Sequence, residues 1–186
     1  TDTANADCRF EAEWMRNTGL FVGESISGEG CFQPEKPVSR GEFLAMVIQA
    51  LEIPVEDASY TGMPEDTPDW LKPYLAAAMR SGLTAGWPDM ETGCFGADQP
   101  ISGGEAAVML QNALDLSVSQ QALETAQTDA AQVPAWAAAS LTAMNDHGID
   151  LTAADALTRG EVAQVMYQIS HLEADAPGLA VLRLQQ

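Results

Sequence analysis

Basic residues are scarce in this chain of 186 residues. Its 8 lysines and arginines stand against 27 aspartates and glutamates, which gives a formal net charge of −19. A nucleic-acid interface needs clustered cations to neutralise phosphates, and this composition does not supply them. An anionic membrane surface would repel the chain for the same reason. We therefore expect neither nucleic acid nor an anionic membrane as a partner.

Cysteines and long apolar runs are also scarce. Cys8, Cys31 and Cys94 are too few for a disulfide scaffold, and their spacing forms no CxxC zinc motif. One disulfide with a free thiol and three free thiols both fit the sequence. No apolar run approaches the ~18–20 residues of a membrane span, so we expect no membrane insertion. Apolar residues still make up 46% of the chain, which indicates a folded protein.

Three short segments of the chain resemble one another. They read Pro37-Val38-Ser39-Arg40-Gly41-Glu42, Pro100-Ile101-Ser102-Gly103-Gly104-Glu105 and Ala156-Leu157-Thr158-Arg159-Gly160-Glu161. Ser102 follows Ser39 by 63 residues, and Thr158 follows Ser102 by 56. A glycine recurs upstream of each segment, at positions 19, 82 and 148, and a tryptophan precedes the second and third of these glycines by twelve residues. Anchors that recur in the same order indicate an internal repeat.

Each repeat is predicted to contain a helix, a loop and a second helix. In the second unit, the first helix carries a stripe of Trp70, Leu71, Tyr74, Leu75 and Ala78, which predicts one buried face. We expect each first helix to end at a left-handed glycine. The second helices carry stripes with helical spacing. These are Phe43, Met46, Val47, Ala50 and Leu51; Ala106, Met109, Leu110, Ala113 and Leu114; and Val162, Val165, Met166 and Ile169.

The start of each second helix carries a capping-box sequence. The pairs are Ser39 with Glu42, Ser102 with Glu105, and Thr158 with Glu161. In such a box the hydroxyl accepts from the third helical amide, and the carboxylate accepts from the N-cap amide. A purely structural role therefore accounts for these serine, threonine and glutamate side chains.

Capping does not account for Arg40 and Arg159. Both would occupy the first helical position, where the helix dipole makes a cation mildly unfavourable. A guanidinium beside free helix N–H groups would make a receptor for an anion or a carboxylate. A surface salt bridge to a neighbouring repeat is the alternative. The second unit has Gly103 at this position and lacks the group.

These ordered motifs resemble a triplet of S-layer homology (SLH) repeats. The second unit contributes Trp70, Gly82, Gly86-Trp87-Pro88-Asp89 and Phe95; the first contributes Gly19, Gly23, Gly30-Cys31-Phe32-x-Pro34 and Val38-Ser39-Arg40-Gly41-Glu42. The resemblance extends over roughly 7–170. It divides the chain into SLH-like repeats at 7–57, 60–118 and 128–172, the third with a degenerate loop, and a C-terminal tail at 173–186.

The resemblance implies an all-α fold, with three helix–loop–helix repeats in a pseudo-threefold spindle around a central three-helix bundle. It also implies a monomer that anchors a secreted protein non-covalently to a bacterial cell wall. The ligand would be a secondary cell-wall polysaccharide, often pyruvylated, bound in grooves between repeats at the cell surface. The protein it anchors would be a cargo domain upstream of this chain, and no cofactor is implied.

The resemblance also points to ligand-binding residues. In the family, the arginine of the capping motif and nearby loop residues line the grooves. Carried over, these are Arg40 and Arg159, supported by Ser39, Glu42, Thr158 and Glu161. Trp87 would stack on a sugar face, although a packing role fits it nearly as well.

Departures from the family pattern leave an alternative open. The second unit lacks its arginine, the first has Asp7 in place of the helix-one tryptophan, and the third has a short loop. A structural or protein-interaction module that has lost polysaccharide binding fits these departures. The chain has no G-x-S-x-G, H-E-x-x-H or P-loop motif, so we expect no enzyme and no catalytic residues. We also expect no metal site, although weak calcium binding by the acidic cluster Glu65-Asp66-x-x-Asp69 fits the sequence.

Overall fold

The computed structural model describes residues 2–4, 6–21, 23–27, 29–56, 62–85, 93–117, 135–153 and 155–172. Within these ranges the chain forms six helices and one small sheet. The helices are α1 (Arg9–Thr18), α2 (Arg40–Ala50), α3 (Lys72–Arg80), α4 (Gly103–Leu114), α6 (Ala135–Asp146) and α7 (Arg159–Ser170). The fold is helix-rich, as predicted.

The small sheet corrects the all-α expectation. Strand β1 (Glu24–Ile26) pairs antiparallel with β2 (Glu29–Cys31), so that Glu24 lies opposite Cys31. Sequence reasoning missed the hairpin because its strands are three residues long and polar, and so they lack the alternating apolar pattern that marks a strand.

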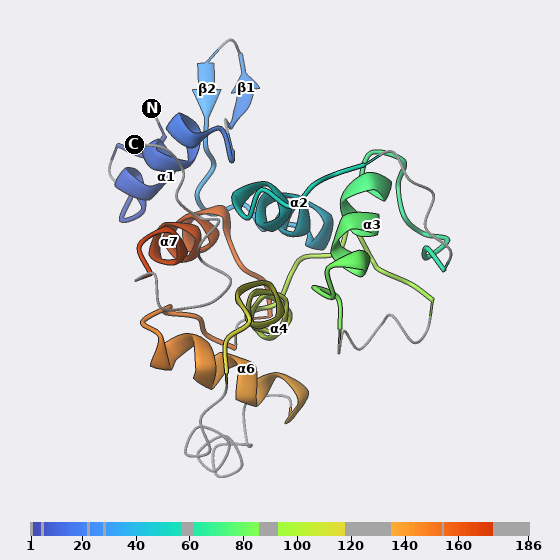
Figure 1. The fold of residues 1–186 in the computed structure, drawn as a ribbon. Coiled ribbons are helices and arrows are strands. Elements are labelled where there is room, and N and C mark those ends of the chain that lie inside the picture. The colour runs from blue at the N-terminus through green and yellow to red at the C-terminus, as the bar shows by residue number, and fades with distance from the viewer. Residues whose placement is uncertain are drawn as a thin grey trace.

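The helices pack in pairs that join different predicted units. Helix α2 packs against α3, α4 against α6, and α7 against α1. Figure 1 shows α2, α4 and α7 toward the middle of the molecule, with α1, α3 and α6 outside them. The second helix of each predicted unit is therefore covered by the first helix of the next, and α7 with α1 closes the circuit. The units share one hydrophobic core rather than three separate ones.

Three backbone segments meet in a closed ring of hydrogen bonds beside this core. The amide of Val38 donates to the carbonyl of Leu157 at 2.9 Å, that of Leu157 to Ile101 at 2.8 Å, and that of Ile101 to Val38 at 2.9 Å. Each of the three residues directly precedes a capping serine or threonine. The ring therefore fixes the starts of α2, α4 and α7 next to one another.

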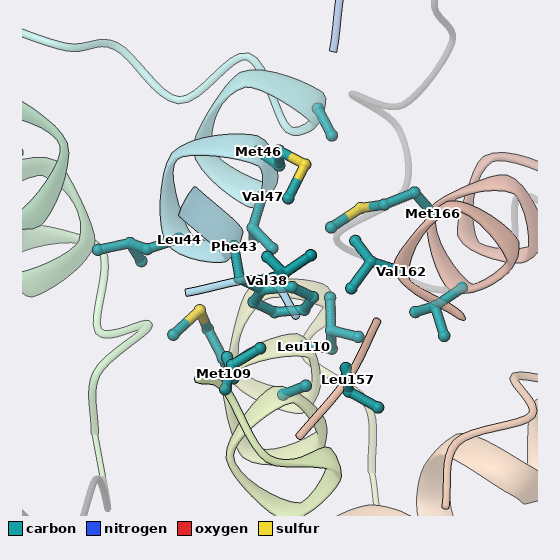
Figure 2. Packing of buried hydrophobic residues seen from close by; sticks show 14 of the residues in the cluster. Val38, Phe43, Leu44, Met46, Val47, Met109, Leu110, Leu157, Val162 and Met166 are labelled. Atoms are coloured by element: carbon teal, nitrogen blue, oxygen red, sulfur yellow. The ribbon is translucent and has the colours of Figure 1, made fainter. Parts of the chain in front are cut away.

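The predicted stripes of the second helices face this core. Their members are buried except for Ala113, which is half-buried against the core cluster. Figure 2 shows the ring of Phe43 surrounded by side chains of other segments, among them Leu110, Leu157 and Val162. The stripe prediction for the second helices is confirmed.

The predicted buried face of the first helix in the second unit is partly wrong. Trp70 is 49% exposed, and Trp136, its counterpart in the third unit, is 41% exposed. Helix α3 begins only at Lys72, with a proline in its first turn, so Trp70 lies on the turn before the helix. Proline is favoured at a helix start because it has no N–H to satisfy. Leu71 and Leu75 are fully buried, as expected.

The glycine stops of the first helices are confirmed. Gly19, Gly82 and Gly148 have φ values of 78°, 77° and 75°. Beyond two of them, the amide of Leu83 donates to Ala78 and that of Ile149 to Met144, each at 2.9 Å. This is the hydrogen bond of a Schellman stop, and it turns a buried apolar residue back onto its helix.

Candidate functional site

The starts of α2, α4 and α7 all carry the predicted capping box. Ser39 and Ser102 each accept from the amide of the glutamate three residues on at 3.2 Å, and Thr158 does so at 3.3 Å. In return Glu42, Glu105 and Glu161 accept from the cap amides at 2.9, 2.9 and 2.7 Å. These contacts give Ser39, Glu42, Thr158 and Glu161 a structural role at the site.

The backbone amides of the first two residues of α2 and α7 also have hydrogen-bond acceptors. At α2, Arg40 donates its amide to Gln99 and Gly41 donates to Ala97, both at 2.9 Å. At α7, Arg159 donates to Lys36 and Gly160 to Pro34, again at 2.9 Å. The expectation of free helix N–H groups is therefore wrong for these two helices. A loop of the neighbouring unit supplies the acceptors that an anion was expected to supply.

The guanidinium of Arg40 spans two units. Its Nη1 donates to the carbonyl of Phe95 at 3.3 Å, and its Nη2 forms an ion pair with Glu105 of α4. The Glu105 side chain is 7% exposed, and its other oxygen holds the cap amide of Ser102. A salt bridge to a neighbouring unit was one of the two interpretations of Arg40, and the pair is buried rather than on the surface.

The guanidinium of Arg159 has a similar setting with a different acid. Its Nη1 donates to the carbonyl of Phe32 and to Oε1 of Gln33, both at 3.1 Å, and its carbon lies 4.7 Å from the centre of the Phe21 ring. Its Nη2 pairs with Glu24 of β1. Lys36 donates to the same Glu24 oxygen at 2.7 Å. Hydrogen bonds from Arg159 and then Lys36 lower the pKa of Glu24 to about 2.

Two aspartates that sequence reasoning did not assign hold the loops behind these arginines. Asp66 accepts from the amides of Phe95 and Gly96 at 2.9 and 2.7 Å. Asp2 accepts from the amides of Phe32 and Gln33 at 2.9 and 2.6 Å. Each arginine therefore donates to the carbonyl of a phenylalanine whose amide is held by a carboxylate. The recurrence of Cys-Phe at a spacing of 63 was the available signal for this pair of loops.

Replacing Asp66 with asparagine should destabilise the protein by about 1 kcal/mol at neutral pH, because an amide group accepts these two bonds less well than a carboxylate. Burial opposes ionisation of Asp66, but the amides of Phe95 and Gly96 outweigh it and lower its pKa below 3.8. A lowered pKa means that this contribution is present above the unfolded-state pKa and is lost as pH falls through the folded-state pKa. Urea unfolding from pH 7 to pH 3 should therefore show a shallower acid loss for Asp66→Asn. Glu65→Gln, which changes an exposed carboxylate one residue away, is the control and should leave this pH dependence unchanged.

Glycines let a neighbouring unit approach each of the three helix starts. A Cβ added at Gly41 would lie 3.1 Å from the Trp70 ring, and one at Gly104 would lie 2.8 Å from the Cβ of Ala137. At Gly160 the same atom would lie 3.1 Å from the Cys8 sulfur. The exposed indoles of Trp70 and Trp136 therefore lie beside the first turns of α2 and α4. The sequence predicts that Trp70 lies on a buried face, and it does not indicate the exposure of either tryptophan.

The third helix start differs because Asp7 takes the place of the tryptophan. An open groove lies there, lined by Asp7, Glu35, Thr158 and Glu161 among others. Its lining carries three carboxylates. Trp87, the remaining predicted ligand residue, lies outside the described residues.

Other chemistry in the described part of the chain is limited. Cys8, Cys31 and Cys94 are all free thiols. Among the described residues, no group of three or more histidine, cysteine and acidic side chains is arranged to hold a metal ion. None of the described helices has the length and apolar character needed to cross a membrane.

One serine and one histidine lie within hydrogen-bond distance. Oγ of Ser170 is 2.9 Å from Nδ1 of His171, but that nitrogen is also 2.8 Å from the carbonyl of Tyr167. A ring nitrogen that meets a carbonyl carries the proton, so it cannot accept one from the serine. The contact is therefore not a nucleophile–base pair.

Comparison with known families matches residues 60–107 to the S-layer homology domain. The matched stretch contains α3 and the start of α4, with Trp70, Asp66 and the Ser102 capping box. S-layer homology domains are generally cell-wall anchoring modules and imply association with the bacterial cell surface. No curated protein matches the chain.

Proposed function

We propose that this chain anchors a secreted protein non-covalently to a bacterial cell wall by binding secondary cell-wall polysaccharide in grooves between three SLH-like units. The units are the segments 7–57, 60–118 and 128–172. The family match covers most of the second unit. The first and third are assigned by their equivalent contacts with the second, and we take the three as a pseudo-threefold triplet around α2, α4 and α7.

The observation that carries the proposal is the closed ring of Val38, Ile101 and Leu157. Three backbone segments exchange hydrogen bonds in one direction at 2.8–2.9 Å, and each leads into a capped helix. Each helix start then meets the first helix of the next unit. Such a circuit creates three corresponding junctions, each between the start of one second helix and the first helix of the next unit, and a repeating polymer is a fitting ligand for repeated junctions.

The three junctions offer different groups to a sugar. Those at α2 and α4 present the half-exposed indoles of Trp70 and Trp136, whose flat faces suit the apolar face of a sugar ring. The junction at α7 lacks an indole but holds Arg159, whose acid partner Glu24 is partly exposed. We assign Arg159 as a ligand-binding residue, and we assign Arg40 as a positioning residue, since its partner Glu105 is buried.

Sedimentation with purified, protein-free bacterial cell-wall sacculi tests the proposal. The chain should sediment with the sacculi. Arg159→Ala and the pair Trp70→Ala with Trp136→Ala should each weaken binding roughly tenfold, because a hydrogen bond to a charged group and a stacked ring each contribute about 1.4 kcal/mol or more.

Phe10→Ala is the matched control for the tryptophan variants. Phe10 is an exposed aromatic residue on α1 whose ring contacts Tyr167 near the end of α7 rather than the start of that helix, so this variant should bind as the original chain does. Circular dichroism of every variant checks the fold. Absence of sedimentation by the original chain would contradict the proposal.

The second candidate is a structural or protein-interaction module on the same fold. It is favoured by the internal acid partners of Arg40 and Arg159 and by the net charge of −19, which gives no long-range attraction to an anionic polymer. In that case sacculi would not bind, and native mass measurement would show self-association or a protein partner instead of a monomer. Under either candidate we propose that the chain acts by binding and not by catalysis.

A further inference from the structure

Arg159 is a buried cation that is paired with one partly exposed carboxylate. The residue is 3% exposed, whereas the side chain of its partner Glu24 is 43% exposed. Behind the guanidinium lie the Phe32 carbonyl and the Phe21 ring. Its Nε is buried and has no hydrogen-bond partner among the described residues. Glu24 is therefore the partly exposed member of an ion pair whose cation is buried.

The equivalent arginine uses a different kind of acid. Arg40 pairs with Glu105, the capping glutamate of the next helix in the circuit. The corresponding capping glutamate for Arg159 is Glu42, and both line one narrow pocket. Arg159 nevertheless pairs with Glu24, which belongs to no helix cap. Arg159 thus pairs with a carboxylate on a surface strand, whereas Arg40 pairs with a carboxylate of α4 that is buried in the core.

The two acids differ in what it costs to displace them. Moving Glu105 would leave the Ser102 amide without its acceptor and would bury an unpaired charge. Glu24 lies on a hairpin whose strands have three residues each, and such isolated hairpins are marginally stable. Gly23, with φ of 82°, precedes the strand and provides a turn that few other residues adopt. Displacement of Glu24 therefore requires only a local rearrangement.

We propose that Glu24 is an internal stand-in for a ligand carboxylate, and that a carboxylate on the bound polymer displaces it from Arg159 and Lys36. The inference rests on the proposed wall-binding function and adds to it that a residue of the chain itself competes with the polymer at the α7 junction. Two cations converge on one oxygen of Glu24, so the site already accommodates a carboxylate. Bidentate guanidinium recognition favours such a planar anion. Once Glu24 leaves, the ligand gains a guanidinium that Phe32 and Gln33 already hold in place.

The test compares Glu24→Gln with Glu29→Gln in sedimentation with protein-free sacculi. Both variants remove one negative charge from the same hairpin, but Glu29 is exposed on β2 and is not part of the Arg159 site. Glu24→Gln should bind about fivefold more tightly, because it removes a partly exposed ion pair that competes with the ligand for Arg159. Glu29→Gln should bind as the original chain does. Circular dichroism and thermal unfolding establish that both variants are folded.

Two further experiments identify the chemical group of the polymer that Arg159 binds. Adding Arg159→Ala to Glu24→Gln should abolish the gain. Sacculi whose carboxylates have been amidated should also abolish it, whereas a ligand phosphate would survive that treatment and overturn the carboxylate assignment. Binding by Glu24→Gln that equals or falls below that of the original chain would refute the internal stand-in, even where Arg159→Ala shows that the wall-binding function holds. Failure of every protein, Glu24→Gln included, to sediment would overturn both proposals.

Discussion

Replacing Arg40 with alanine is expected to lower the free energy of unfolding by about 3–5 kcal/mol, because it leaves the buried carboxylate of Glu105 without its cation. The same change removes the donor to the Phe95 carbonyl. Arg40 joins α2 to α4 and to the loop held by Asp66, so its loss affects both the ion pair and the loop contact of one junction. Urea unfolding followed by circular dichroism measures the effect.

A double-mutant cycle separates the ion pair from the rest of the arginine side chain. Glu105→Gln retains a capping side chain, since glutamine also serves at this position of a capping box. If the pair is coupled as its geometry indicates, Arg40→Ala should cost much less in the Glu105→Gln background than alone. A loss below about 1 kcal/mol for Arg40→Ala alone would show that the charge is solvated rather than buried, and would contradict this assignment.

Replacing Phe43 with alanine should cost about 3–5 kcal/mol, because the ring fills the space where the segments of the three predicted units meet. Its side chain has no exposed surface. Figure 2 places the ring among residues contributed by α4, α7 and the segment that precedes α7, including Leu110 and Leu157. Removing the Phe43 side chain leaves a cavity beside the backbone hydrogen bonds of Val38, Ile101 and Leu157. The measurement is again the free energy of unfolding in urea.

Phe10 offers a matched control for Phe43. It is the same residue type, but 61% of its surface is exposed. Phe10→Ala should change stability by no more than about 0.5 kcal/mol, apart from a small loss of its edge contact with Tyr167. Equal losses in the two variants would mean that the shared core does not depend on this junction.

The caps and stripes could be predicted because they are local. A serine or threonine with glutamate three residues later satisfies amides of its own helix start, and the three boxes formed as expected. The apolar positions of the second helices recur at helical spacing, and one face must be buried wherever that helix packs. The glycine stops follow in the same way, since the left-handed conformation favours glycine at any helix end.

Predictions that required a partner from another segment were less successful. Trp70 has the spacing of a buried face but lies before the start of α3, so it is half-exposed. The helix amides beside Arg40 and Arg159 were expected to be free, but loops from other units supply their acceptors. The short strand that carries Glu24 has no apolar alternation, and its role as the acid beside Arg159 has no local signature.

The sequence by itself determined the helical units, their caps and stops, the likeness to S-layer homology repeats and the absence of a basic footprint. Each of these depends on residues that are close together in the chain or on composition. The tertiary structure alone decided that second helices pack on the first helix of the next unit, and that Arg40 is paired within the core while Arg159 is paired with a surface strand. The physical reason is that the two ion pairs join residues that are 65 and 135 positions apart in the chain. At such separations the packing of the fold, and not the spacing in the sequence, sets the identity of a partner.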